Sequence, residues 1–428
     1  MFKNFITKSQ KNGFIALYLT ILILTVVFVL AGSISLVAFN QQKISKNAVK
    51  SIQAFYAAES GIEDILQRLK INPALAGMNY NLSVGSGTTN VVLSSIIGGS
   101  RTVVSKGDFS SRTRKTSAVF HIESQKVSFC YGAQVGAGGM TMGNGSEIKG
   151  NVFSNGSVIG KGIIDDTIIV AGNGNKIEDL TVEKNASAHT CKDSTITGTL
   201  TYVSGGSTTG CSATGGIYSQ SNQILSEDLP ISADQINEWK SEAASGGIVT
   251  SNVSISGEVN FLGPVQIGTT GAPKNLTLNN NAKLSVKGTI YVTGDIVFNN
   301  GSETKLDDNS YGSLSGVILS DGKITASNGS EQKGSGETGS YIMLLSTNSS
   351  LDSGSPAIYV GNNAAGAIFY TTSGLIYLKN NMKAKEITGY KIQIENGAVV
   401  EYDSGLQNAQ FTSGPGGSWQ ASDWKEIE

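Results

Sequence analysis

The sequence predicts an α+β protein. It has a long N-terminal transmembrane helix, a small antiparallel sheet, and a large, mainly β domain that forms a parallel, right-handed β-helix with one inserted helix. Three observations predict this fold. Residues 14–39 form an uncharged apolar run, residues 46–70 keep helical spacing, and the 428 residues include 53 glycines but only 6 prolines. An excess of glycine over proline indicates many ordered tight turns.

The chain is too long for one ordinary compact core, so we expect several units. Changes of pattern divide it into a leader (1–13), a transmembrane and protruding helix (14–70), a small antiparallel β domain (71–130) and a β-helical head (131–428). The net charge of −2 supplies no global basic field for a nucleic acid, and we predict no nucleic-acid partner. No arginine follows residue 114.

The apolar run is long enough to span a membrane. Its 26 residues would reach about 39 Å as a helix, against about 30 Å for the hydrocarbon core, and it is longer than a secretory signal core. Small residues that could form a signal-peptide cleavage site, Ala31–Ser33, lie deep inside it. Lys3, Lys8 and Lys11 precede it and favour a cytoplasmic N-terminus. We therefore expect a single-pass membrane protein with its head outside the cytoplasm.

The helical pattern continues beyond the membrane segment. Between Lys46 and Lys70, apolar residues recur at three- and four-residue steps, with longer gaps filled by alanine. They are Val49, Ile52, Phe55, Ile62, Ile65 and Leu69. This spacing predicts one long helix that packs on its own globular domain.

The N-terminal region resembles known prepilins. A basic leader, Gly13, the aromatic Phe14 and an uninterrupted apolar helix look like a type IV prepilin. The stretch "QAFYAAESGIEDIL" (Gln53–Leu66) is similar to the helix end of PilX-type minor pilins. The residues that carry this motif are Phe55, Tyr56, Ala57, Ala58, Glu59, Gly61 and Glu63.

The resemblance implies a processing route and partners. A prepilin peptidase would cut after Gly13, and Phe14 would become the methylated N-terminus of a helix that is kept. The helix would then contact the membrane and other pilins or pseudopilins. The fifth mature residue of major pilins is usually glutamate, whereas here it is Tyr18. This departure favours a minor pilin or a pseudopilin.

Residues 75–128 predict a small sheet laid on the protruding helix. Segments such as "TTNVVLSSI" and "RTVVSKGDF" alternate apolar and polar residues between glycine-containing breaks, which is typical of three or four antiparallel strands. His121 stands alone in the last of them, where a histidine is a packing or surface residue more often than a ligand.

The sequence of the head predicts stacked short strands. Pieces such as "GNVFSNGSVIGKG" (Gly150–Gly162) and "GTIYVTGDIVFNNG" (Gly288–Gly301) recur every 15–25 residues, each as two short strands with a glycine turn. In a parallel β-helix each rung covers the apolar face of the previous one, and about 20 residues per rung would give some 12–14 rungs. A stack of β-sandwiches is the alternative.

One helix interrupts the head at residues 232–245. Ser232 is its expected N-cap, with Gln235 completing a capping box, and Ile236 and Trp239 lie on one face. We expect this helix to lie along the solenoid.

The end of the chain is aromatic. We expect Trp419 and Trp424 to cover the last rung, because the open ends of a solenoid need covering. Stacking on sugar rings is the alternative for these two side chains.

The three cysteines permit one disulfide. The head would lie where thiols oxidise, so we expect Cys191 and Cys211 to pair, with a reduced, buried pair as the alternative. His189 could join them as a metal ligand, but a fourth ligand is missing, and we predict no metal. Cys130 is left over and is expected to be a small buried residue.

We predict no catalytic residue and no cofactor. The only Asp-Asp pairs are Asp165–Asp166 and Asp307–Asp308, and neighbouring residues on a strand point to opposite faces. A lyase arginine is impossible in a head without arginine.

These patterns predict a non-catalytic minor pilin or pseudopilin, assembled at low copy or at the tip of a type IV pilus-like filament and exposed at the filament or cell surface. Its head would serve adhesion to a glycan or surface receptor, assembly priming or secretion. The alternative is a membrane-anchored, extracellular β-helical protein that binds or acts on a glycan. A mature chain that starts at residue 14 favours the first function.

Overall fold

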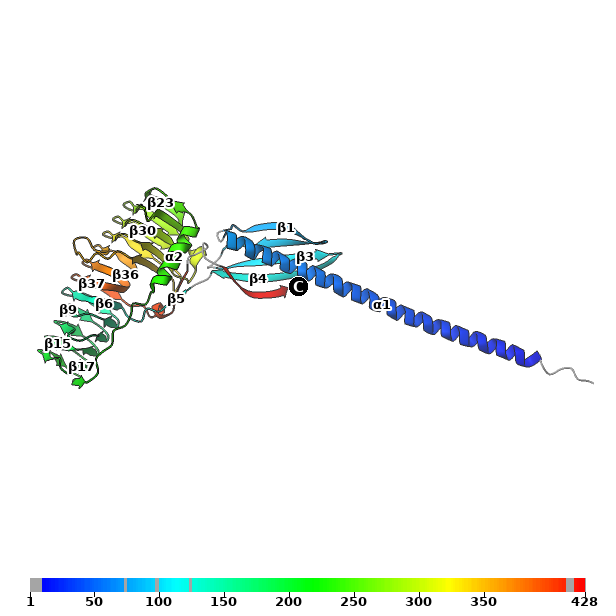
Figure 1. Cartoon of the computed structure of the whole chain (residues 1–428), viewed down its shortest axis with the longest axis horizontal. Coiled ribbons are helices and arrows are strands. Elements are labelled where there is room, and N and C mark those ends of the chain that lie inside the picture. The colour runs from blue at the N-terminus through cyan, green and yellow to red at the C-terminus, as the bar shows by residue number, and fades with distance from the viewer. Residues whose placement is uncertain (1–9, 73–74, 97–99, 123–124, 413–418, 428) are drawn as a thin grey trace, which may run out of the picture.

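A computed structural model describes residues 10–72, 75–96, 100–122, 125–412 and 419–427. It comprises a long helix, a small sheet packed on the end of that helix, and a solenoid of short strands (Figure 1). The predicted fold class is confirmed. The handedness of the solenoid and residues 1–9 of the leader stay predictions, and the latter lie outside the described residues.

Helix α1 runs without a break from Gln10 to Ile71, 62 residues or about 93 Å. Its first half stands clear of the rest of the molecule, and its last turns lie on the small sheet (Figure 1). One side of these last turns is buried, at Ala54, Ala57, Ala58, Gly61, Ile62, Ile65 and Leu69. The predicted packing face is thus confirmed at Ile62, Ile65 and Leu69. It is wrong at Val49 and Ile52, which are more than half exposed because they precede the part of α1 that the sheet covers.

The small sheet has five antiparallel strands in the order β1-β2-β3-β4-β40. They are β1 (Met78–Val84), β2 (Gly87–Leu93), β3 (Ser100–Phe109), β4 (Arg112–Ile122) and β40 (Trp419–Ile427). The apolar residues of its inner face, among them Val91, Val103 and Phe120, pack against Ile62 and Ile65 of α1. Four of the strands are those expected from residues 75–128.

The fifth strand corrects the expected role of the chain's end. Trp419 and Trp424 lie in β40, which pairs with β4, so residues 419–427 belong to the small sheet and cover no rung of the head. The reason is that the chain leaves the head where it enters it, because β5 (Gln125–Val127) and β39 (Ala409–Phe411) pair side by side. The head is therefore an insertion between β4 and β40.

The head contains two windings of short strands. The first winding, residues 133–220, contains β6 (Ala133–Met142), β7 (Glu147–Lys149), β8 (Val152–Ser154), β9 (Val158–Gly160), β10 (Ile163–Ile164), β11 (Ile168–Val170), β12 (Lys176–Glu178), β13 (Thr181–Val182), β14 (Ala186–Ala188), β15 (Thr190–Lys192), β16 (Thr195–Ile196), β17 (Leu200–Val203), β18 (Thr208–Thr209), β19 (Ser212–Ala213) and β20 (Ile217–Gln220).

The second winding, residues 248–401, contains β21 (Ile248–Val249), β22 (Val253–Ile255), β23 (Glu258–Leu262), β24 (Val265–Thr269), β25 (Ala272–Pro273), β26 (Leu276–Leu278), β27 (Lys283–Val286), β28 (Ile290–Val292), β29 (Ile296–Phe298), β30 (Glu303–Leu306), β31 (Gly316–Ser320), β32 (Ile324–Ala326), β33 (Glu331–Lys333), β34 (Ile342–Ser346), β35 (Ile358–Val360), β36 (Ala365–Leu378), β37 (Lys383–Ile394) and β38 (Val399–Glu401). The short helices α3 (Asp308–Tyr311) and η1 (Ser404–Asn408) complete the chain.

Strands pair in parallel with the strand one rung away, so the windings form a β-helix with three faces. In the first winding β8 pairs with β11, β9 with β12, and β7 with β10. One ladder continues through both windings as β21-β24-β28-β31-β34-β36-β37-β6-β8-β11-β14-β17-β20, thirteen strand segments of the described chain. This number lies within the expected 12–14 rungs.

The two windings meet in the middle of the stack. The last strands of the second winding, β37 and β38, pair with the first strands of the first winding, β6 and β7. The chain therefore winds outward to β20, returns along the outside in residues 221–247, which we call the strap, and winds inward from β21 (Figure 1). The thirteen stacked strands span about 58 Å. The strap, with twelve extended residues and the thirteen-residue helix α2, spans about the same length, so it can connect the two ends of the stack.

The expected helix of the head is confirmed as α2 (Ala233–Ser245) in the strap. The side chain of Ser232 accepts a hydrogen bond from the backbone N–H of Gln235 at 3.2 Å, as an N-cap does. Ile236 and Trp239 are buried against the outside of the solenoid. Trp239 also packs on Phe411, with 6.0 Å between ring centroids.

A repeated four-residue turn stacks at one corner of the solenoid. Its third residue is glycine or asparagine with φ between 56° and 69°, and its fourth is a small or apolar residue that points into the core. The N–H of the fourth residue donates to the C=O of the first in every copy. The seven copies begin at Gly143, Asn279, Asn299, Ser327, Gly361, Lys379 and Glu395. The left-handed backbone at the third residue explains the Asn-Gly and Asn-Asn pairs of the sequence.

Candidate functional site

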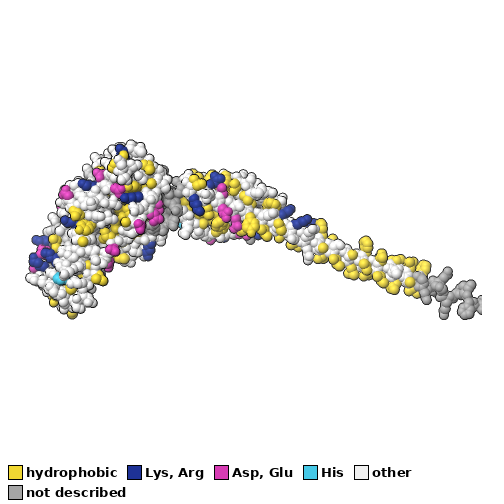
Figure 2. Space-filling view, viewed as in Figure 1, with side chains coloured by type: hydrophobic (Ala, Val, Ile, Leu, Met, Phe, Trp, Pro, Cys, Tyr) yellow, Lys and Arg dark blue, Asp and Glu magenta, His cyan; other side chains and the backbone are white. Residues whose placement is uncertain are grey.

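The apolar half of α1 is bare. Every large hydrophobic side chain from Phe14 to Phe39 is more than half exposed, and the least exposed of them, Val26, reaches 51%. By length and composition the helix can cross a membrane. Figure 2 shows this segment as an almost continuous apolar surface without charged side chains. Such a surface is stable in lipid or against other apolar helices, because exposing this much apolar area to water is unfavourable.

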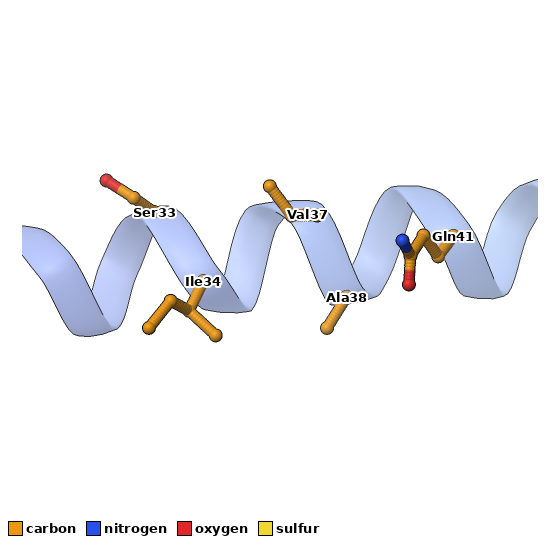
Figure 3. A pocket seen from close by; sticks show the side chains of 5 residues that line it. All are labelled: Ser33, Ile34, Val37, Ala38 and Gln41. Carbon is orange, nitrogen blue, oxygen red and sulfur yellow. The ribbon is translucent and has the colours of Figure 1, made fainter.

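A shallow hollow on α1 illustrates the same point. Figure 3 shows the side chains of Ser33, Ile34, Val37, Ala38 and Gln41, which line it and all project from one helix. No second element closes the hollow, so it is the surface of an unpartnered helix and not an enclosed ligand cavity. The hydroxyl of Ser33 donates to the C=O of Val29 at 2.8 Å, which satisfies this polar group within the helix.

The predicted cleavage site lies near the start of α1. Gly13 is within the helix, and Phe14 follows it directly. The rings of Phe14 and Tyr18 are neighbours, with 5.6 Å between their centroids, and Tyr18 is 66% exposed. Tyr18 therefore lies on the bare surface of the helix.

The small residues of the motif let α1 approach the sheet closely. A Cβ atom on Gly61 would lie 2.2 Å from Oγ of Ser105 on β3. A Cβ on Gly107 of β3 would lie 2.1 Å from the backbone oxygen of Ala54 and 2.5 Å from the backbone nitrogen of Ala58. Ala57 and Ala58 are also buried. Helix and strand are in backbone contact here, and only glycine and alanine fit between them.

The other motif residues point away from the sheet. Tyr56 is 61% exposed, Glu63 is exposed, and Phe55 and Glu59 are partly exposed. Helical spacing places Tyr56, Glu59 and Glu63 on one side of α1 with the exposed Val49 and Ile52. We call these five residues the outer stripe. It extends the bare membrane segment along the part of α1 that carries the sheet.

The last turn of α1 is fastened to β1. The carboxylate of Asp64 accepts hydrogen bonds from the guanidinium of Arg68 at 2.6 Å and from the hydroxyl of Tyr80. Burial opposes ionisation of Asp64, but the two hydrogen bonds outweigh it and lower the pKa of this carboxyl. The hydrogen bond to Tyr80 thus holds the end of α1 against β1.

In the head, the structure joins Cys191 and Cys211 by a disulfide, with 6.2 Å between the Cα atoms. It ties β15 to the last rung of the first winding. The expectation for Cys130 is wrong: this residue is exposed. It lies in the segment between β5 and β6, where the neighbouring Phe129 and not Cys130 is directed into the interior.

The remaining candidates for chemistry are separated. Asp166 pairs with Lys184 at 2.6 Å, and Asp307 caps α3 by accepting from the N–H of Ser310 at 2.9 Å. Nδ1 of His189 lies 3.0 Å from the hydroxyl of Thr190. Within the described residues, three or more His, Cys, Asp or Glu side chains nowhere gather as a metal site would require.

Sequence reasoning missed one polar network, which holds the strap. Nζ of Lys240 on α2 donates to Oδ1 of Asp321 at 2.5 Å, and the hydroxyls of Tyr291 and Thr347 donate to the same carboxylate. Burial is the largest influence on Asp321 and raises its pKa, but these hydrogen bonds together lower it below the usual value. Lys240 lies 81 residues before Asp321, so no local pattern could have paired them.

Comparisons with known proteins add little. No family model matches the sequence, and no curated protein does. Among solved structures, the chain is similar to the competence-associated pilin ComZ from Thermus thermophilus, with 11% identity over 88% of this chain and 97% of that one. The TM-score is 0.19, so the likeness carries no argument.

Proposed function

We propose that this protein is a non-catalytic, membrane-inserted minor pilin or pseudopilin that carries its β-helical head on the outside of a filament or of its base. One observation carries the proposal. The bare, uncharged segment of α1 continues without a break into a motif whose small residues are packed on a sheet and whose outer stripe is exposed.

The two surfaces of α1 give the steps of the proposed cycle. The bare segment first holds the protein in the membrane with the head outside. After removal of the leader at Gly13, the same segment leaves the lipid for a bundle of apolar helices. The apolar part of the outer stripe, Val49, Ile52 and Tyr56, then lies against neighbouring subunits, since it extends the exposed apolar surface of the bare segment along the helix.

Tyr18 supports a low-copy or terminal position in the filament. Cleavage leaves a positive amine on Phe14, which the helix bundle would bury. An unpaired buried charge typically costs several kcal/mol, and a neighbour's carboxylate offsets it. Tyrosine can donate or accept a hydrogen bond but has no charge at neutral pH. A terminal subunit avoids this cost, because no neighbouring subunit depends on its carboxylate to offset a buried amine.

The inserted head is consistent with display. Its entry and exit strands, β5 and β39, are paired, so the head adds a separate body without changing the sheet that packs on α1. Adhesion, assembly priming and secretion are the roles proposed for this body.

The test is the distribution of the protein in sheared filaments. Immunogold against the head should mark one pole of each filament, or only the envelope base, and the protein should be present at far below one copy per major subunit. Regular labelling along the shaft would contradict the placement. Complete absence from filaments and their base, with the head retained in the membrane, would favour the alternative of an anchored glycan-binding protein.

A further inference from the structure

Both ends of the solenoid are open. We call the rung of β18, β19 and β20 end A and the rung of β21, β22 and β23 end B. They lie at opposite ends of the stack, with the small sheet attached between them (Figure 1). No strand of the described chain pairs with the outer edges of these strands. Their backbone N–H and C=O groups are therefore free to pair with another strand.

The apolar core is also left uncovered at both ends. At end A, Ile217 occupies the inward column that continues Leu200, yet it is 42% exposed because nothing stacks on it. At end B, the inward side chains of Val249, Val253 and Val259 are only partly buried. Repeat proteins normally close such ends with a polar capping unit.

Few charges protect the exposed strand edges at the two ends. Residues 198–226, which include all of end A, contain no charged side chain, and end B carries one, the exposed Glu258 at the start of β23. In Figure 2 the end that carries β17 is mostly white, and charged side chains gather on the rungs behind it. Natural proteins place lysine, proline or a bulge on an edge that must stay unpaired. Neither end has a lysine in its strands, although β23 of end B has a register irregularity between Asn260 and Leu262.

The two ends fit each other. The windings progress in one sense along the stack, from β21 to β38 and then from β6 to β20. End A of one copy would thus stack on end B of the next copy in the same direction as neighbouring rungs stack within one head. Tyr218 and Ile248 stand at opposite ends of one unbroken outward column of paired residues, so they would be direct neighbours across such a joint.

The molecule already contains a joint of this kind. β37 and β38 stack on β6 and β7 by parallel pairing, although no short connection links these two windings. The end of one winding can therefore pair with the start of another. We propose that the heads of two copies of this chain associate end to end, with end A of one copy continuing the β-ladders of end B of the other.

This contact is heterologous, so it leaves a free end on each side and can extend to further copies. It does not depend on the proposed role of α1. Heads carried by separate membrane anchors or filaments could thus be linked to each other.

Directional cross-linking tests the proposal on the full-length chain in detergent. In a Cys130→Ser background, which removes the exposed thiol, Tyr218→Cys and Ile248→Cys each place one thiol at one end. Adjacent parallel strands bring paired Cα atoms to about 4.8 Å, within the range of a disulfide. Mixing the two variants under mild oxidation should give a disulfide-linked dimer, whereas neither variant alone should form one.

A matched control separates this joint from association through α1. Thr201→Cys stands in the same outward column one rung inside end A, and when mixed with Ile248→Cys it should not cross-link. A Tyr218→Cys/Ile248→Cys double variant should give a series of longer oligomers, since the two ends of one copy are about 58 Å apart and cannot join.

Two cross-linking results would overturn the proposal. Dimers formed equally by one variant alone would indicate contact between like ends, and the absence of a dimer in the mixture would mean that the ends do not meet.

Sedimentation measures the same contact without introduced cysteines. The mass of the protein without the substitutions should rise with concentration, Tyr218→Lys should abolish that rise by adding an edge charge, and Thr201→Lys should leave it unchanged. A mass that responds equally to both lysines would contradict the end-to-end contact.

Discussion

The membrane half of α1 and the solenoid hold apolar side chains in opposite situations. From Phe14 to Phe39, every large apolar side chain of the helix is more than half exposed. In the solenoid, inward columns such as Ile290, Ile318 and Leu344 are completely buried by the rungs above and below. The helix therefore needs lipid or other helices around it, whereas the solenoid supplies its own core at every rung except those at its two ends.

The comparison teaches where each region obtains its stability. The solenoid depends on contacts within one chain, so substitutions there should change its unfolding. The helix depends on surroundings that the chain does not provide, so substitutions there should change insertion and assembly and leave the head unaffected. The variants below test this separation.

The largest loss of head stability is expected from Trp239→Ala. Trp239 is 1% exposed and fixes α2 against the outside of the second winding. Removing a buried tryptophan typically costs about 3–5 kcal/mol. Urea unfolding followed by circular dichroism measures it. Ser241→Ala, on the exposed side of the same helix, is the control and should change the midpoint little. Equal shifts in both variants would mean that the strap is not packed as described.

Replacing Cys191 and Cys211 with serine should cost about 3 kcal/mol. In the chain-entropy model, this is the effect of opening a loop of 20 residues. Cys130→Ser should leave unfolding unchanged, because Cys130 is exposed. Thiol labelling of the unreduced, denatured protein should modify Cys130 alone. Three labelled cysteines would show that the disulfide does not form.

Asp321→Asn should cost about 1–2 kcal/mol at neutral pH, since it removes a charged acceptor from Lys240, Tyr291 and Thr347. The folded pKa of Asp321 is lowered, so its contribution is complete above the unfolded value of about 3.9. The contribution is lost as the pH falls through the folded pKa. The difference in unfolding free energy between the two proteins should therefore shrink below about pH 4. A difference that is constant from pH 7 to pH 3 would contradict the role of the charge.

The smallest effect on the head is expected from Val27→Lys in the bare segment. Val27 is 57% exposed, so the unfolding midpoint of the head should move by less than about 0.5 kcal/mol. The same charge in the middle of a membrane helix costs about 2.5–3.5 kcal/mol of insertion, and the protein should be depleted from the membrane fraction. Loss of head stability in this variant would break the separation between helix and solenoid.

Local patterns predicted the elements well. The apolar run and its continuation predicted α1, alternation predicted four strands of the small sheet, and Ser232 with Ile236 and Trp239 predicted α2. Each of these depends on neighbours within a few residues. The glycine turns of the sequence mark the breaks between strands, but only the structure shows that seven turns share one form, with a small or apolar fourth residue directed inward.

The arrangement of these elements could not be predicted in the same way. The pairing of β37 with β6, and of β40 with β4, joins residues hundreds of positions apart, and no local residue type marks either partner. Trp419 and Trp424 looked like end caps because an aromatic cluster at the end of a chain fits a solenoid end equally well. The exposure of Cys130 depends on the neck formed by β5 and β39, which is also nonlocal.

The most direct test of the account is the mature N-terminus of the protein in cells that process prepilins. If α1 is a pilin helix, intact mass and N-terminal sequencing should show a chain that begins at Phe14, with its amine methylated. Gly13→Val, which adds bulk at the cleaved residue, should leave the chain uncut from Met1 and absent from filaments. A chain that begins at Met1, or after Ser33, in the unsubstituted protein would contradict the central claim that the leader is removed and the bare helix is kept.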